Sequence, residues 1–329
     1  MLNNTNATSR VNVMTLDTQA IAELVPVALL IVIANGLVLV LFARRKKLRT
    51  APNYVLFSLA VCDFMTGIIN IPLFIIIAFT PVITSLEFRY YMAVLVSVLN
   101  NLTAISACYH ILAATTEKYL SIIWPVTHRL MTRKTVIKVL QVVWVASCIV
   151  AFIPFAWVDM EDAGTQANLK VGYVIFCIVA VFLLPYAFMI YAFVVIFKSI
   201  YNQRKTKGSI FSRPHVSRQA AMEKRCLILF ASMATIFLIC WLPWFILMLL
   251  YKVMYNVEEL ELPAHVFVLV RYATSITNPV LYTFFRRDFN KALKSLFKSK
   301  RLRRFSSPLF SRGSDTSEPV VNLVDEIAV

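Results

Sequence analysis

Residues 55–79 read VLFSLAVCDFMTGIINIPLFIIIAF, an almost unbroken apolar run that contains one charged residue, Asp63. A helix that crosses the hydrocarbon of a membrane needs about 20 predominantly apolar residues, so this segment is long enough to span one. An ionised side chain at mid-membrane costs at least about 2.5–3.5 kcal/mol on insertion scales. Asp63 therefore either ties helices together through hydrogen bonds or serves as an ion site or a protonation switch.

Six further segments share this length and character. They lie at residues 21–42, 93–115, 136–157, 171–197, 226–251 and 264–285. The composition agrees, because 59% of the 329 residues are hydrophobic and 15% are charged, whereas soluble domains average about 45–50% and about 25%. We predict an all-α integral membrane protein. Its parts are an N-terminal tail (1–20), a seven-helix bundle (21–285), an amphipathic cytoplasmic helix (286–299) and a C-terminal tail (300–329).

The distribution of charge predicts the orientation of the bundle. Of the 33 Lys and Arg residues, 28 fall in alternate connections and in the C-terminal segment. The positive-inside rule then puts the N-terminus outside and the C-terminus in the cytoplasm of a multi-pass plasma-membrane protein. The net charge of +16 is thus explained by topology. Nucleic-acid binding is disfavoured, since the basic residues flank helices and form no motif of a DNA- or RNA-binding module.

The third apolar segment carries more polar side chains than its neighbours, among them Asn100, Asn101, Ser106 and His110. Lipid offers these groups no hydrogen-bond partners, so we expect this helix at the centre of the bundle. For His110 the favoured interpretation is a neutral hydrogen bond between helices. Asn100 and Asn101 lie nearer the outer end and are candidates to line a ligand pocket.

Short motifs occur in order, with one in each predicted helix. They are Asn35-Gly36, Leu59-Ala60-Val61-Cys62-Asp63, Glu117-Lys118-Tyr119, Trp144, Pro185, Cys240-Trp241-Leu242-Pro243 and Asn278-Pro279-Val280-Leu281-Tyr282. With these motifs the chain resembles the rhodopsin-like (class A) G-protein-coupled receptors over residues 21–296. The resemblance implies a receptor, not an enzyme, that transmits the signal of an extracellular ligand to a heterotrimeric G protein. Arrestin is a further partner that it implies.

The resemblance also implies two groups of functional residues. A network of water and a sodium ion, with Asp63 as the sodium ligand, would involve Asn35, Asp63, Ser275, Asn278 and Tyr282. The switch and the G-protein contact would involve Glu117, Lys118, Tyr119, Glu223, Trp241, Pro243 and Pro279. Trp241 stands at the family's toggle position, although a core tryptophan without a switching role is the alternative. Ala107 occupies a position where the family usually has a hydroxyl, which argues against strong sodium binding.

Two features depart from the family pattern. Lys118 stands where the family has arginine, and lysine lacks the planar fork that binds a carboxylate through two hydrogen bonds. We therefore expect a looser clamp between Lys118 and Glu223. Ala93 stands where a cysteine normally bonds to the second outer loop, and residues 158–170 contain no cysteine. We expect this loop to be held by packing alone.

The predicted ligand pocket combines aromatic rings with a few polar groups. Its candidate residues are Asn100, Asn101, Trp241, Trp244, Phe245, Arg271 and Tyr272. Asn100 stands where amine receptors carry an aspartate, so an amine ligand is disfavoured, and the absence of a lysine at Tyr272 excludes a retinal Schiff base. Arg271 pairs either with an anionic ligand or with an acidic residue of the outer loop, Glu258, Glu259 or Glu261. The ligand is then a small molecule, with a lipid or an acid favoured over an amine.

Both terminal segments carry short modification or binding motifs. Asn3 and Asn6 begin glycosylation sequons in the tail assigned outside. Ser306 and Ser307 follow a basic run typical of kinase sites, and residues 326–329 fit a PDZ groove. The helix 286–299 alternates apolar and basic residues, a pattern typical of a helix on anionic membrane lipid.

The alternative function is a seven-helix transporter or channel. Such a protein would show inverted repeats, paired broken helices or rings of charge along a pore. The sequence shows none of these patterns. No convergent catalytic set or CxxC metal site is evident either, because all six cysteines lie in apolar segments.

Overall fold

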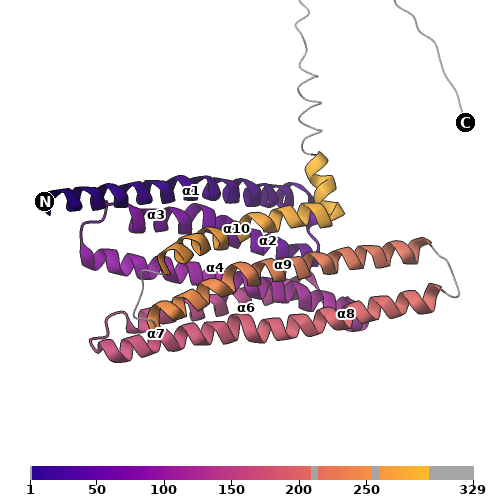
Figure 1. Ribbon diagram of the computed structural model, residues 1–329. Helices are drawn as coiled ribbons and strands as arrows, with labels where there is room; N and C mark the ends of the chain where they lie inside the picture. Colours follow the sequence, from indigo (N-terminus) through magenta and orange to yellow (C-terminus); the bar gives the residue numbers. More distant parts are fainter. Residues whose placement is uncertain (1, 209–213, 254–259, 296–329) are drawn as a thin grey trace, which may run out of the picture.

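The protein is a bundle of long helices that lie side by side along a common direction (Figure 1). The structure, a computed structural model, describes residues 2–208, 214–253 and 260–295, except for the side chains of 2–17, 51, 203–208, 214–220 and 261. Its longer helices are α1 (Leu2–Arg44), α2 (Ala51–Met65), α3 (Ile71–Phe79), α4 (Leu86–Ile123), α6 (Arg133–Phe152), α7 (Ala163–Cys177), α8 (Leu184–Gly208), α9 (Pro214–Val253) and α10 (Glu261–Phe285). Shorter ones are η1 (Lys46–Leu48), η2 (Thr66–Asn70), α5 (Pro125–Leu130), η3 (Ile153–Trp157) and η4 (Ile178–Leu183).

Six of the described helical segments are long and apolar enough to cross a membrane. They correspond to the first six predicted spans, since α2, η2 and α3 form one segment and α7, η4 and α8 form another. The seventh predicted span is α10, which carries the polar residues Arg271 and Asn278 within its length. The described part of the chain contains no strand. The prediction of an all-α membrane bundle is therefore confirmed.

Helix α4 occupies the centre of the bundle. It packs against α2, α6, α8 and α9, and its buried face includes Asn100, Ser106 and His110. These polar side chains thus face other helices and not lipid, as the sequence predicted. The outward faces of the bundle carry exposed apolar residues such as Ile33, Val142 and Leu184, which is appropriate for a surface in contact with acyl chains.

Prolines coincide with irregular turns in three of the spans. Pro72 and Pro185 each follow a π-helical segment, η2 and η4, and Pro154 lies in the 3₁₀ turn η3. Proline removes a backbone donor and its ring crowds the preceding turn, so a locally wider or tighter turn relieves the clash. Pro243 and Pro279 lie inside α9 and α10.

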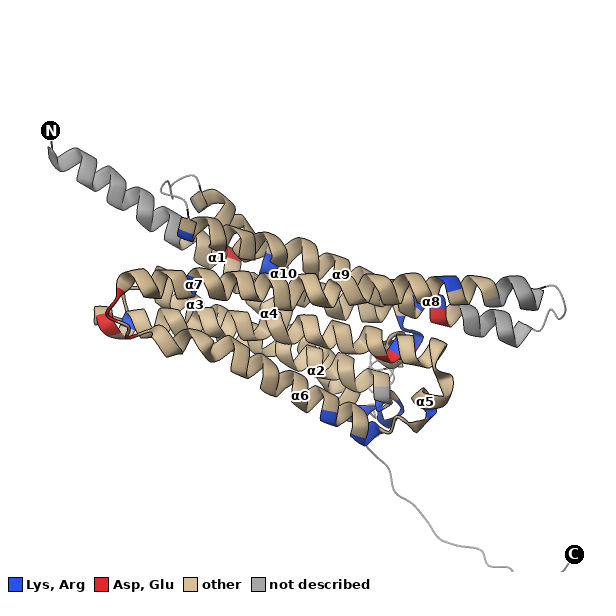
Figure 2. Cartoon of the chain, turned by 90° about the horizontal axis from the view of Figure 1, so that it is seen from below, with Lys and Arg blue, Asp and Glu red and all other residues tan. Residues whose placement is uncertain are grey.

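The two ends of the bundle differ in charge (Figure 2). Lysine and arginine gather at the end that carries α5 and the C-terminal part of α8. At the opposite end, the loop before α7 exposes Asp159, Glu161 and Asp162.

A further helical segment follows α10 at residues 287–295, inside the predicted amphipathic helix 286–299. Its Phe289 is buried with its ring centroid 6.0 Å from that of Tyr282, whereas Lys291 and Lys294 are exposed. Helix α1 begins at Leu2, so it continues into the predicted tail 1–20. The side chains of Asn3 and Asn6 lie outside the described residues, and so do Ser306, Ser307 and the whole tail 300–329.

Candidate functional site

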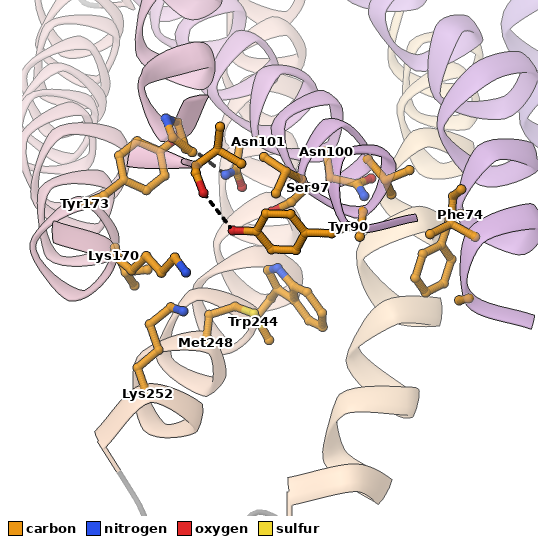
Figure 3. Close-up of a pocket in the computed structure, with 18 of the residues that line it drawn as sticks. Phe74, Tyr90, Ser97, Asn100, Asn101, Lys170, Tyr173, Trp244, Met248 and Lys252 are labelled. Atoms are coloured by element: carbon orange, nitrogen blue, oxygen red, sulfur yellow. Dashed lines mark hydrogen bonds between the residues drawn. The ribbon is translucent and has the colours of Figure 1, made fainter. Parts of the chain in front are cut away.

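A cavity of about 490 Å³ opens between α3, α4, α7, α9 and α10, near the acidic end of the bundle (Figure 3). Five of the predicted pocket residues line it, namely Asn100, Asn101, Trp244, Phe245 and Arg271. The structure adds lining residues that the sequence analysis did not select, among them Phe74, Arg89, Tyr90, Ser97, Lys170, Tyr173, Met248 and Lys252. Their sequence signal was weak, because aromatic and basic residues near helix ends are common in any membrane protein.

Arg271 forms one wall of this cavity and is only 2% exposed. Its guanidinium carbon lies 4.1 Å from the centroid of the Trp244 ring and 4.7 Å from that of Tyr272. Its Nη2 donates a hydrogen bond to the Tyr272 hydroxyl (3.3 Å), which in turn donates to Oδ1 of Asn100 (3.0 Å). The Nε of Arg271 has no hydrogen-bond partner among the described residues. Aromatic faces thus support this cation, and part of its hydrogen-bonding capacity is unused.

Trp241 and Tyr272 do not line the cavity but lie directly behind Arg271. The Trp241 ring centroid is 5.9 Å from the guanidinium carbon of Arg271. Its Nε1 donates to the Thr274 hydroxyl (3.2 Å), and this hydroxyl donates to the Arg271 carbonyl (2.6 Å). The ring also stacks on Phe237, with centroids 5.8 Å apart. Through these contacts Trp241 of α9, which the sequence predicts as a switch residue, is joined to the cavity wall on α10.

Four of the five residues predicted for the ion and water network are brought together by hydrogen bonds. Asp63, 4% exposed, accepts one from the Ser275 hydroxyl (2.7 Å) and one from Nδ2 of Asn278 (2.9 Å). Asn35 donates to the carbonyls of Ile31 (3.0 Å) and Ser275 (2.8 Å), which ties α1 to α10. Tyr282 is buried, and neither its hydroxyl nor Oδ1 of Asn35 has a partner among the described residues.

His110 makes the interhelical hydrogen bond that the sequence favoured. Its Nδ1 lies 2.6 Å from the Ser106 carbonyl, so this nitrogen carries the proton, and Nε2 accepts from the Ser58 hydroxyl at 2.7 Å. Trp144 completes the chain by donating from Nε1 to the same hydroxyl (3.0 Å). The arrangement is satisfied by a neutral imidazole and joins α4, α2 and α6.

At the basic end of the bundle, Glu117 is buried and binds two basic side chains. Its carboxylate lies 2.9 Å from Nζ of Lys118 and 2.8 Å from Nε2 of His128 on α5. Sequence reasoning missed His128, because only the turn of the chain into α5 brings it to Glu117. The clamp between Lys118 and Glu223 stays a prediction. Tyr119 packs beside Tyr191, with centroids 6.1 Å apart.

One family of known proteins matches most of the chain. The family model described as 7 transmembrane receptor (rhodopsin family) matches residues 34–282. The chain belongs to the rhodopsin family of seven-transmembrane receptors. It is therefore a G-protein-coupled receptor, and the match gives no support to a transporter or channel.

Individual relatives share low sequence identity with the receptor, and their names refer to different ligands. It is 23% identical to mouse (Mus musculus) 5-hydroxytryptamine receptor 5B, over 81% of each chain. It is 26% identical to rat (Rattus norvegicus) somatostatin receptor type 4, over 81% of this chain and 70% of the relative. It is also 26% identical to mouse trace amine-associated receptor 9, over 85% of this chain and 84% of the relative.

The loop before α7, which the sequence predicts to lie outside the cell, is held by tyrosines from the start of α4. Tyr91 donates a hydrogen bond to the Asp159 carboxylate, and Tyr90 donates to the Val158 carbonyl (3.4 Å). Gln166 of α7 donates to the Trp157 carbonyl (2.9 Å). All six cysteines are free thiols. Hydrogen bonds to Asp159 and Val158 thus hold this loop, which the sequence analysis expected to rest on packing alone.

Proposed function

We propose that this receptor lies in the plasma membrane, binds a small molecule in the cavity beside Arg271 and activates a heterotrimeric G protein at its basic end. The observation that carries this proposal is the short connection from the cavity to the switch. Arg271 lines the cavity, and Thr274, one turn further along α10, holds the indole of Trp241 on α9. A ligand that moves Arg271 or Trp244 therefore alters the contact between α9 and α10.

Helix α9 is suited to transmit such a change. Pro243 lies two residues after Trp241, and proline removes the hydrogen bond that would hold this part of the helix straight. A shift of the Trp241 ring can then tilt the cytoplasmic part of α9 against α4, where Glu117 and Lys118 lie. The role assigned to the chain is signal transmission, and it requires no enzymatic reaction.

The polar network at Asp63 fits a bound sodium ion. Each carboxylate oxygen of Asp63 accepts one described hydrogen bond and keeps further acceptor capacity, while the buried Oδ1 of Asn35 is unused. Oxygen atoms are the ligands that hard cations prefer. A sodium ion there would hold α1, α2 and α10 in one arrangement, so its loss would accompany activation.

Charge supports the proposed orientation, with the N-terminus outside and the basic end in the cytoplasm (Figure 2). This orientation makes Asn3 and Asn6 available for glycosylation, and an Asn3→Gln/Asn6→Gln variant that loses a glycosidase-sensitive mass shift would support it.

We also propose arrestin and a PDZ protein as partners of the cytoplasmic tail. Ser306 and Ser307 are the proposed phosphorylation sites of this tail, and anionic lipid is the proposed contact of helix 286–299.

Second-messenger profiling of the expressed receptor tests the proposed function. Signalling is first recorded without added ligand in each G-protein pathway, and then against panels of amines, lipids and small acids. We expect a response in at least one pathway that Trp241→Ala abolishes at matched surface expression. A flat response in every pathway from receptor at the cell surface would contradict the proposal.

A further inference from the structure

The cavity wall carries a charge imbalance. Among the described residues that line it, four are basic, namely Arg89, Lys170, Lys252 and Arg271, and none is acidic. The amino groups of Lys170 and Lys252 point toward the same side of the cavity (Figure 3). Positive charges gathered around a site of low dielectric attract and retain an anion.

Arg271 is the most buried of these cations, and its buried Nε has no hydrogen-bond partner among the described residues. The described polar contact of the Arg271 side chain is the neutral hydroxyl of Tyr272. Burying a guanidinium is costly unless an anion and its hydrogen bonds compensate. Aromatic faces supply part of the compensation, which leaves the planar fork available for a carboxylate or phosphate.

Apart from these cations and polar groups such as Ser97, Asn100 and Asn101, the lining of the site is mostly apolar, and a second cavity adjoins it. This cavity, of about 340 Å³, shares Phe74, Trp244 and Met248 with the first. Its other walls come mainly from apolar residues of α1, α3, α9 and α10, such as Leu24, Phe79 and Leu269. The cation therefore lies beside an apolar volume larger than a small acid alone would fill.

We propose that the ligand is an amphipathic organic anion with a single chain, whose acid group pairs with Arg271. Its chain packs on Phe74, Trp244 and Met248 toward the second cavity. Lys170 and Lys252 attract the anion to the outer part of the site. This inference rests on the proposed function, in that the cavity is taken as the ligand site.

Binding to purified receptor in phosphatidylcholine nanodiscs tests the ligand class directly. The probes are dodecanoate, dodecyl phosphate, 1-dodecanol, dodecylamine and butanoate, and the readout is the change in unfolding temperature across a titration. Both long-chain anions should bind, and their relative affinity distinguishes a carboxylate head from a phosphate head. Dodecanoate should bind on the order of 100-fold more tightly than butanoate, because methylene burial adds affinity. Equal binding by the alcohol or the amine, or by butanoate, would overturn the proposal.

Variants of the receptor locate the anion. Arg271→Gln should weaken dodecanoate binding on the order of 100-fold, because it leaves the acid group without its partner. Arg271→Lys should retain part of the affinity, and Lys138→Gln, which removes an exposed cation at the opposite end, should retain all of it. Full binding by Arg271→Gln would overturn the proposal.

A competing partner for Arg271 is an acidic residue of the segment 258–261, and two measurements separate the possibilities. Arg271→Met should raise the unfolding temperature of receptor without added anion, because it removes a buried charge that lacks compensation. The triple variant Glu258→Gln/Glu259→Gln/Glu261→Gln should bind dodecanoate as wild type does. A fall in unfolding temperature for Arg271→Met, or a large gain in binding by the triple variant, would assign Arg271 to the loop and overturn the proposal.

The same probes separate this inference from the proposed function. If dodecanoate binds through Arg271 but changes no second messenger, the ligand class stands and the signalling role of the cavity fails. If other compounds signal through Trp241 while no anion binds, the signalling role stands and the ligand class fails.

Discussion

The guanidinium of Arg271 lies over the indole of Trp241, with 5.9 Å between the guanidinium carbon and the ring centroid. Arg271 belongs to the wall of the cavity, and Trp241 lies two residues before Pro243 in α9. Thr274 connects them a second time, because its hydroxyl binds the Trp241 indole and the Arg271 carbonyl. An anion bound at Arg271 would therefore lie one layer of side chains away from Trp241, the proposed switch residue.

Thr274→Val should raise signalling without added ligand. The substitution leaves the buried Trp241 N–H without an acceptor, at a cost of about 1–3 kcal/mol to the described packing of α9 on α10. About 1 kcal/mol corresponds to roughly a fivefold change in a two-state ratio. Thr274→Ser keeps the hydroxyl and is the matched control. Equal basal second-messenger levels for the valine and serine variants, at matched surface expression, would show that this bond does not hold the switch.

Asp63→Asn should remove the effect of sodium on the receptor. The substitution replaces one carboxylate oxygen by an NH2 group, which leaves one acceptor oxygen for the donors Ser275 and Asn278, and it deletes the charge that a cation requires. We expect sodium chloride, compared with choline chloride, to raise the unfolding temperature of wild type but not of Asp63→Asn. Glu87→Gln, which removes an exposed acid, should respond as wild type does. A sodium effect that persists in Asp63→Asn would place the ion elsewhere.

Lys118→Arg should lower basal signalling. The ammonium of Lys118 contacts Glu117 at 2.9 Å, and a guanidinium at that position can bind a carboxylate through two hydrogen bonds. Tighter pairing should favour the arrangement in which the Glu117 side chain holds α4 to His128. Lys118→Gln, which abolishes the ion pair, should act in the opposite direction. Basal second-messenger levels that are the same in all three receptors would rule out a role for this departure from the family pattern.

Tyr91→Phe should loosen the loop before α7. The Tyr91 hydroxyl donates to Asp159, and no disulfide joins the described part of this loop to α4. Loss of a hydrogen bond worth about 1 kcal/mol should speed hydrogen–deuterium exchange of residues 158–162 up to roughly fivefold. The control is Tyr201→Phe, at an exposed tyrosine on α8. Identical exchange in the two variants would show that the hydrogen bond from Tyr91 to Asp159 does not restrain the loop.

Protonation of Asp288 at low pH should make the receptor less stable. Burial acts to raise the pKa of Asp288, but hydrogen bonds and the charge of Arg286, with a hydrogen bond from Asn53, outweigh burial and lower this pKa below its usual value. A lowered pKa means that the carboxylate stabilises the fold above its unfolded pKa of about 3.9 and loses this effect as the pH falls.

The unfolding temperature of Asp288→Asn should therefore lie below that of wild type at pH 7, and the gap should narrow between about pH 4 and pH 3. Lys294→Gln, at an exposed position of the same helical segment, is the control for changes in charge alone. A gap that does not change with pH would assign the effect of Asp288 to packing.

Hydropathy predicted the seven spans because length and apolar content are set by the thickness of a membrane, whatever the neighbouring helices are. The family resemblance implied one network of Asn35, Asp63, Ser275 and Asn278, and hydrogen bonds bring these four residues together in the structure. Sequence could not predict that Lys170 and Lys252 meet in the cavity with Arg271. Their convergence depends on the rotation of α7, α9 and α10 about their axes, which packing sets and hydropathy does not record.

The most direct test of the account is photo-crosslinking with a dodecanoate that carries a diazirine in its chain, mapped by mass spectrometry. We predict labels on Phe74, Trp244 or Met248 that unlabelled dodecanoate displaces and that disappear in Arg271→Gln. Labels confined to the lipid-facing surface, or labels at the cavity that persist in Arg271→Gln, would contradict the claim that Arg271 binds an anionic ligand next to the switch.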